Sequence, residues 1–277
     1  MRLVRSIKNK DSLLTILVYG SAATVFAILL SIILYIVLNG IGHLTPEIFS
    51  PVYTTSNLSM LPAIVTSVQM TGLALLIASP LGIFTGIYLV EYARRGNKVV
   101  DVVRIMAETL AGIPSIVYGL FGMLLFVLFL DWGFSLRAGV FTVSIMILPL
   151  IMRTTEEALK SVPDTYREGS YGLGAGKLRT VFKIVLPSCA PGILAGIILA
   201  IGRIVGETAA LLFTAGSVPR IATSIDQSAR TLAIHMYALS SEGQHINEAH
   251  ATAVVLLITV IFLNTLSTFI AKKISKG

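Results

Sequence analysis

The sequence predicts an all-α integral membrane protein with six transmembrane helices. Hydrophobic residues make up 55% of its 277 residues and charged residues only 13%, and the mean hydropathy is +0.86. A soluble domain carries about 25% charged residues. The apolar residues form six runs, and the basic residues lie mostly between them. All but one of these runs reach the roughly 20 residues that a helix needs to cross a bilayer.

The expected spans are 13–38, 61–90, 105–130, 138–152, 188–215 and 251–271. The first follows a basic N-terminus like that of a signal peptide. Its 26 uncharged residues exceed the core of a signal peptide, which has about 7–15, so we expect a retained helix. Pro80 predicts a kink or tilt in the second run. The fourth has only 15 uncharged residues, with Arg137 and Arg153 placed to reach the two interfaces.

The lysines and arginines predict the orientation of the spans. Of the 21 in the chain, 17 lie in the two tails and in segments 91–104 and 153–186, and three lie in the alternate segments. Positive residues are retained on the cytoplasmic side of a membrane. We therefore expect a multi-pass protein of the cytoplasmic (inner) membrane with both termini in the cytoplasm. Segment 216–250 would be an outer connection, with a short interfacial helix near 231–239.

The composition also disfavours several function classes. The net charge of +7 is spread between apolar runs rather than gathered in a patch, which argues against nucleic acid as a partner. The single cysteine allows no internal disulfide. The sequence has no Ser/His/Asp or HExxH arrangement, so we expect no enzyme activity, metal or cofactor in this chain. The histidines fall in outer segments, where we expect them to be solvated or interfacial: His43, His235, His245 and His250.

Charged residues inside the fifth run are the strongest functional signal. Arg203 and Glu207 are four residues apart, so on a helix they would share one face. Arg203 would lie at or somewhat outside the midplane, where a charge costs at least about 2.5–3.5 kcal/mol. Its planar guanidinium suits bidentate binding of an oxyanion, with Glu207 orienting and balancing it. The alternatives are that the two residues only neutralise each other, or that Glu207 belongs to a proton relay.

The third run adds candidates for a translocation pathway. Pro114 leaves a carbonyl without its helical partner, so Ser115 and Tyr118 could line a pathway; a simple kink in a packed helix is the alternative. Glu108, near the start of this run, is better explained as an interfacial carboxylate than as a substrate contact. The candidate substrate-translocation residues are Arg203, Glu207, Thr208, Ser115 and Tyr118.

Pairs of glycines predict close contacts between helices. Three pairs have the small-xxx-small spacing of such contacts: Gly82/Gly86, Gly192/Gly196 and Gly202/Gly206. Two of these pairs lie in the fifth run, whose surface is small over much of its length. We therefore expect the fifth helix deep in the bundle or at a subunit interface.

Segment 161–187 has four closely spaced glycines followed by a lysine, as a phosphate-binding P-loop does. The match fails because Tyr171 stands where the first glycine is required and Leu178 where the metal-binding hydroxyl is required. Instead, Pro163 and the acidic residues after it predict a helix, and the glycines predict a bend. Helical apolar spacing then runs to Pro187, which we expect to end a second helix. Such an exposed pair suits docking in a partner's groove, although an ordinary loop is the alternative.

The spacing in this segment resembles the EAA motif of permease subunits of bacterial ABC importers. The matching positions are Glu168, Gly174, Ile184, Leu186 and Pro187. Gly169 and Ser170 stand where the family usually has two alanines, and the glycine should weaken the first helix by about 0.5–1 kcal/mol. The resemblance implies that the loop forms coupling helices that seat in a separate ATPase subunit. The docking residues it implies are Glu168, Gly169, Gly174, Lys177, Ile184, Leu186 and Pro187.

A narrower resemblance covers roughly residues 60–270. The stretches AGIPSIVYGLFG (111–122) and GRIVGETAALLFTAGS (202–217), together with the EAA loop, look like PstA-type permeases of phosphate importers. This resemblance implies a type I ABC importer permease fold. It divides the chain into a tail, first helix and outer loop (1–60), a permease domain (61–271) and a cytoplasmic tail (272–277). Arg203 and Glu207 match the charged pair that the family associates with phosphate translocation.

The same resemblance implies the partners and the activity. A PstC-like permease would form a heterodimer with this chain in the lipid bilayer, and two PstB-like ATPase subunits would hold ATP and Mg. An external PstS-like protein would deliver phosphate, which the permeases translocate by alternating access. Alternatives are an ABC permease for sulfate, molybdate or phosphonate and, less favoured, a proton-coupled secondary anion transporter.

Overall fold

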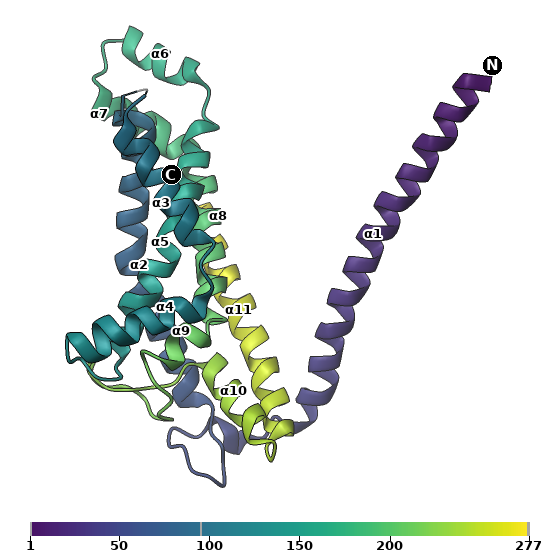
Figure 1. The fold of residues 1–277 in the computed structure, drawn as a ribbon, viewed down its shortest axis with the longest axis vertical. Coiled ribbons are helices and arrows are strands. Elements are labelled where there is room, and N and C mark those ends of the chain that lie inside the picture. The colour runs from purple at the N-terminus through teal and green to yellow at the C-terminus, as the bar shows by residue number, and fades with distance from the viewer. Residues whose placement is uncertain (1, 95, 276–277) are drawn as a thin grey trace.

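This computed structural model describes residues 2–94 and 96–275, and its helices follow the apolar runs of the sequence (Figure 1). Arg95 and Lys276, two of the residues used for the orientation, lie outside the described part, as does the end of the expected tail. The elements are α1 (Arg2–Gly40), η1 (Ile41–His43), η2 (Pro46–Phe49), α2 (Leu61–Ile87), η3 (Tyr88–Tyr92), α3 (Lys98–Ala111), α4 (Ser115–Gly122), η4 (Met123–Phe129), α5 (Leu136–Lys160), α6 (Asp164–Gly172), α7 (Lys177–Thr180), η5 (Val181–Val185), α8 (Leu186–Val205), α9 (Ala209–Leu212), α10 (Leu232–Glu242) and α11 (Ile246–Ser275).

The third apolar run is bent. Among the described residues, five helices are long and apolar enough to span a membrane, and a sixth span exists if α3 and α4–η4, which meet at 102°, cross it together. Gly112 ends α3, and Pro114, which has no N–H to continue the helix, takes an extended conformation. The Tyr118 hydroxyl donates to the Leu110 carbonyl at 2.8 Å across the bend. The run 105–130 is therefore broken next to Pro114, where the sequence predicted a disturbed or kinked helix, and the bend is sharper than a simple kink.

The fourth span is longer than its apolar run. α5 has 25 residues, and its side chains are the most enclosed of the spans, with 67% of its most apolar stretch buried. The Ser135 hydroxyl accepts a hydrogen bond from the Ala138 N–H at 3.4 Å and caps its start. The charged residues after Met152 continue the helix to Lys160, so the expected span 138–152 is too short.

Glycines bring α5 close to its two neighbours. A side-chain carbon at Gly82 or Gly86 of α2 would lie 2.8 Å from Ile151 or Thr155 of α5. Two further glycines, Gly192 and Gly196 of α8, face Ala158 and Thr154 of α5 in the same way. These two pairs confirm the predicted close packing. The pair Gly202/Gly206 does not, because Gly202 has open space around it and Gly206 meets only the Gly202 carbonyl.

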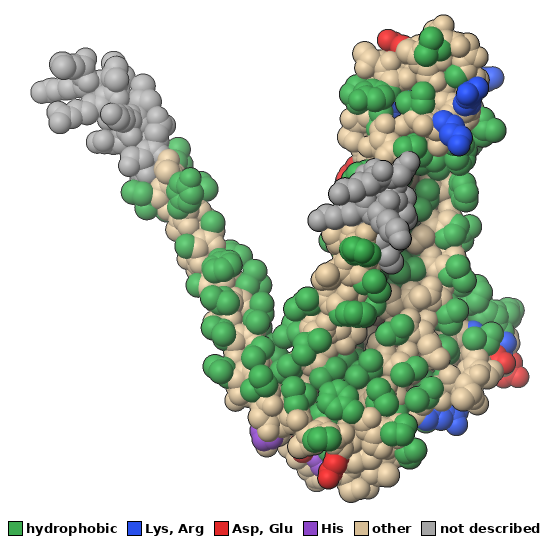
Figure 2. Space-filling view, turned by 180° about the vertical axis from the view of Figure 1, so that it is seen from behind, with side chains coloured by type: hydrophobic (Ala, Val, Ile, Leu, Met, Phe, Trp, Pro, Cys, Tyr) green, Lys and Arg blue, Asp and Glu red, His purple; other side chains and the backbone are tan. Residues whose placement is uncertain are grey.

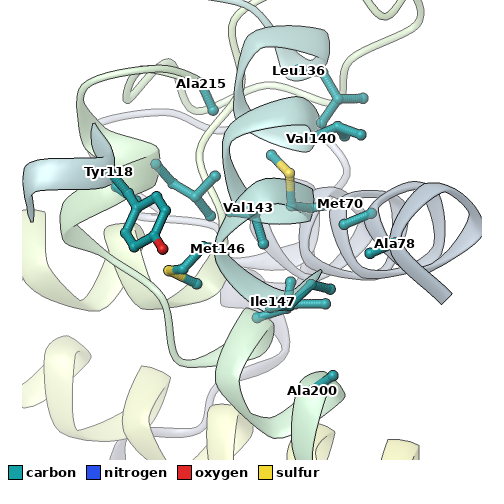
Figure 3. Close-up of a cluster of buried hydrophobic side chains, with 14 of the residues drawn as sticks. Met70, Ala78, Tyr118, Leu136, Val140, Val143, Met146, Ile147, Ala200 and Ala215 are labelled. Carbon is teal, nitrogen blue, oxygen red and sulfur yellow. The ribbon is translucent and has the colours of Figure 1, made fainter. Parts of the chain in front are cut away.

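The main hydrophobic core surrounds α5 (Figure 3). Met70 of α2, Tyr118 of α4 and Ala200 of α8 converge on Val143, Met146 and Ile147 of α5 in this core. The core therefore fixes the bent third run, the second helix and the fifth helix against one central helix.

α1 stands away from the bundle (Figures 1 and 2). None of its most apolar stretch is buried, and apolar side chains cover its surface. Its only ring contact among the described residues is at its far end, where Tyr35 meets His250 of α11 at 5.6 Å. The Gly40 backbone packs against α11 at the same end. This surface is one that lipid or a neighbouring protein can cover.

The end of the bundle opposite α6 and α7 is closed by a polar cluster at the start of α10. The Arg230 guanidinium lies 4.6 Å from the centre of the Tyr53 ring, which meets the His235 ring at 6.1 Å and at 90°. His235 has no exposed surface, so the expectation of a solvated or interfacial histidine is wrong at this position.

Acid should destabilise the fold through His235. Burial, and then the charge of Arg230, lowers the pKa of His235 from its ordinary 6.5 to about 3. Below pH 6.5 the unfolded chain takes up a proton that the folded chain refuses, so stability is lost as the pH falls from there towards 3, by at most about 1.4 kcal/mol per pH unit. The melting temperature of the purified protein, scanned from pH 7.5 to 5, should fall more steeply than that of His235→Gln.

The exposed His43 provides the control for this measurement. His43→Gln should keep the wild-type pH dependence. Equal slopes for the wild type and His235→Gln would contradict the prediction.

Candidate functional site

Arg203 lies in the last turn of α8 and beside the middle of α5. The helix that contains it runs without interruption from Lys177, through the π-helical turn η5 and Pro187, to Val205. Pro187 therefore does not end the second loop helix as predicted, because proline is tolerated in the first turn of α8. Arg203 is half-buried and borders a cavity together with Leu150, which lies near the middle of α5.

This cavity has a volume of about 340 Å³ and lies between α3, α5 and α8. From Arg203 it extends to residues near the end of α5 that leads into α6. Its wall combines apolar residues with charged side chains. The apolar residues are Ala107, Ala111, Pro149, Leu150 and Met152, and the charged residues are Arg104, Glu108, Arg153, Glu156, Glu157, Lys160 and Arg203. With four cations and three carboxylates, the wall carries one net positive charge.

Most charges in the wall are paired with each other. Glu156, whose side chain is 8% exposed, binds Arg104 at 2.8 Å and Lys160 at 2.6 Å. Arg153 pairs with the carboxylate four residues further along α5 at 3.2 Å. Arg203 has no carboxylate within 4 Å among the described residues. Its guanidinium is therefore the cation of this wall that remains available to an anion.

Glu207 does not face Arg203. α8 ends at Val205 with Gly206 as its cap, so Glu207 lies in the break before α9 and not one turn further along the same helix. Its buried carboxylate accepts a hydrogen bond from the Ala210 N–H at 3.0 Å and caps the start of α9. The predictions of a shared helix face and of a span over 188–215 are wrong, because glycine and this local cap end the helix early.

None of the other candidate pathway residues lines the Arg203 cavity, although Tyr118 is near enough to interact with the charge of Arg203. Tyr118 is buried and holds the α3–α4 bend through its bond to Leu110. Ser115 is the first residue of α4, and Thr208 precedes α9; both are half-buried. Of the five candidates, all within the described ranges, the structure places only Arg203 in the cavity wall.

Sequence reasoning missed most of the wall. Glu108 lies in the last turn of α3 and not near a helix start, and it borders the cavity. The charged residues of α5 in the wall fall at i, i+3, i+4 and i+7, which is one face of a helix. That spacing was the available signal, and it was hidden because the apolar run was taken to end at Met152. The wall residues missed are Arg104 of α3 and, on this face of α5, Arg153, Glu156, Glu157 and Lys160.

The segment 161–187 forms two helices with a glycine bend, as the sequence predicted. Gly174 lies in the bend with φ +82°, a conformation that favours glycine. The buried Ser170 and Thr180 hydroxyls are 2.8 Å apart and join the helices on either side. The Lys177 ammonium lies 5.0 Å from the Tyr92 ring at the end of the second span.

The tip of this segment exposes both apolar and basic side chains, as Figure 2 shows for the end that carries α6 and α7. Leu173 is 91% exposed. A hollow of about 430 Å³ beside it is lined by Ser170, Leu173, Gly174, Ala175, Arg179, Lys183 and Ile184. Among the motif residues, Glu168 and Gly169 are exposed in α6, while Ile184 and Leu186 are half-buried where the chain enters α8. The surface is shaped to receive another molecule.

Comparison with known proteins decides the family. Residues 78–277 match the family of binding-protein-dependent transport system inner membrane components. The chain belongs to this permease family. The permease is 36% identical to the probable ABC transporter permease protein YqgI of Bacillus subtilis, over 97% of this chain and 98% of that relative. It is also 36% identical to the phosphate transport system permease protein PstA of Yersinia pestis, over 93% of this chain and 89% of that protein.

Solved ABC transporters share the permease fold. A chain of the bacterial alginate ABC transporter aligns with 98% of this permease and 99% of its own length, with a TM-score of 0.68 and 17% identity. A chain of the MetNI methionine ABC transporter aligns with 78% of this permease and 94% of its own length, with a TM-score of 0.61 and 18% identity. The expected type I ABC importer permease fold is confirmed, and the chain is a multi-pass inner membrane protein.

Replacing the unusual glycine of the motif should stabilise α6. A side-chain carbon at Gly169 meets no atom within 4 Å, so Gly169→Ala should gain about 0.5–1 kcal/mol of helix stability. Hydrogen exchange of the α6 amides should slow by about two- to fivefold.

Gly174→Ala is the matched control, because that position is equally open but has φ +82°. It should speed exchange, since alanine is strained in this conformation. A change in the same direction for both variants would contradict the prediction.

Proposed function

We propose that this chain is one permease subunit of an ATP-driven importer that carries inorganic phosphate across the cytoplasmic membrane by alternating access. The observation that carries the proposal is Arg203, a cation without a carboxylate partner among the described residues, in the wall of a 340 Å³ cavity. A bidentate guanidinium suits the oxygens of phosphate. The similarity to phosphate permeases over most of the chain supports the choice of anion.

The cavity suggests how this state takes part in transport. It runs from Arg203 towards the end of the bundle that carries α6 and α7, which we assign to the cytoplasm together with both termini. A phosphate bound to Arg203 would leave this way, past charges most of which are paired with each other and do not compete strongly for it. Closing this route and opening the other side would expose Arg203 to the outside.

The exposed segment 161–187, which we call the docking segment, supports an energy source in other chains. Its exposed tip would seat on one of two PstB-like ATPase subunits, which would hold ATP and Mg, and a PstC-like permease would complete the membrane pathway. A PstS-like binding protein would deliver phosphate from outside. Glu207 would act by ordering the backbone after α8, because its carboxylate is bonded to the start of α9. This position gives no support to a proton relay through Glu207.

Arg203→Gln should abolish transport while leaving the complex assembled. Losing the half-buried charged partner of the anion costs roughly 3 kcal/mol, so ATP-dependent uptake of labelled phosphate into proteoliposomes should fall about 100-fold or more. Arg220→Gln is the matched control: Arg220 is exposed, lies in the connection after α9, and donates to the Ser228 carbonyl at 3.3 Å. It should transport like the wild type.

Three outcomes would refute parts of this proposal. Wild-type uptake by Arg203→Gln would remove Arg203 from the pathway. Uptake that persists without ATPase subunits and follows the proton gradient would make the chain a secondary transporter. Preference for sulfate, molybdate or phosphonate over phosphate in competition would change the substrate and leave the mechanism intact.

A further inference from the structure

Arg167 joins three helices at the end of the bundle that carries the docking segment. Its Nε and Nη2 donate to Glu91 Oε1 at 3.0 and 2.7 Å. Nη2 also donates to the Leu159 carbonyl at 3.0 Å, and Nη1 donates to the Val162 carbonyl at 2.9 Å and the Asp164 carboxylate at 3.2 Å. All five N–H donors of the guanidinium therefore have acceptors.

The contact is shielded and held in one geometry. The side chains of Arg167 and Glu91 are only 14% and 5% exposed. Burial by itself lowers the pKa of Arg167, but the hydrogen bonds and charge of Glu91, with smaller help from Asp164, outweigh it and leave that pKa raised. Exposed ion pairs are flexible and screened by salt, whereas this pair is enclosed and also bonded to backbone carbonyls. It is a stiff joint between the elements that it connects.

The joined elements are those that would have to move together in a coupled transporter. Glu91 lies in η3, which continues α2, and Leu159 lies in the last turn of α5. Arg167 lies in the middle of α6. Near its C-terminal end, α6 contacts the start of the fifth helix through the Ser170 and Thr180 hydroxyls. α6 is thus fastened separately to the α2–α5 pair and to the helix that carries Arg203.

We propose that Arg167 and Glu91 are positioning residues that transmit movement of the docking segment to the α2–α5 pair. This inference rests on the proposed function, because it requires an ATPase partner that moves α6. α5 packs against α2 through Gly82 and Gly86 and supplies much of the cavity wall, so a displacement of α6 reaches the anion cavity through this joint. Without the joint, movement of α6 reaches α5 only indirectly, through the Ser170–Thr180 hydroxyl contact and the fifth helix.

The test measures phosphate taken up per ATP hydrolysed by the complete complex in proteoliposomes. Glu91→Asp keeps the charge but shortens the side chain, and Glu91→Gln keeps the length but removes the charge. Both should lower the ratio at least about fivefold, the low end of coupling between sites in proteins. The KM for phosphate and the co-purification of the ATPase subunits should not change, because neither the anion site nor the docking tip is altered.

Arg137→Gln is the matched control, since it breaks the ion pair of 2.9 Å with Asp226 at the opposite end of α5. It should keep the wild-type ratio. An unchanged ratio in both Glu91 variants would overturn the inference, and so would failure of even Glu91→Asp to assemble, because the pair would then serve folding alone. Absence of phosphate uptake by the wild-type complex would instead refute the proposed function.

Discussion

The close packing of α5 against α2 and α8 is the constraint on which the other features depend. Gly82 and Gly86 face α5 from one side and Gly192 and Gly196 from the other, so α5 is held between two nearby backbones. The helices are so close at these glycines that any larger side chain would meet atoms closer than van der Waals contact allows. Such close packing leaves each helix little freedom to slide. The register that results places Arg203 beside the middle of α5. It also leaves the space between α3, α5 and α8 in which the charged wall is built.

Within this frame, the charged residues serve two distinct purposes. Glu156 and Glu91 are nearly enclosed and each has its own cations, so they fix helices to one another. Arg203 differs, since no carboxylate of the described part of the chain lies within ion-pair distance of it. A carboxylate attached there would compete with a transported anion at every cycle. The early end of α8, which turns Glu207 away to cap α9, therefore keeps the arginine free for a mobile partner.

The sequence pattern predicted the features of the structure that depend on interactions between residues close together in the chain. Apolar length located the spans, and the glycines located both the bend at Gly174 and the close contacts of α5. The ends of the helices were harder to predict from the sequence, because they also depend on contacts between distant segments. Beyond Met152, α5 continues with charged residues, one of which, Glu156, pairs with Arg104 from another helix. The cavity wall was missed for the same reason: its members come from three helices, whose register no single run of sequence reveals.

The unbroken helix from Lys177 to Val205 has a mechanical consequence. Its 29 residues span about 40 Å, with the segment that we propose docks on an ATPase at one end and Arg203, the anion-binding residue that we propose, near the other. A rod of that length is a lever: a tilt of only about 10° around one end would carry the other through about 7 Å, more than the pitch of one helical turn. In the transport cycle that we propose, the length of this helix sets how far Arg203 moves for a given tilt at the docking segment.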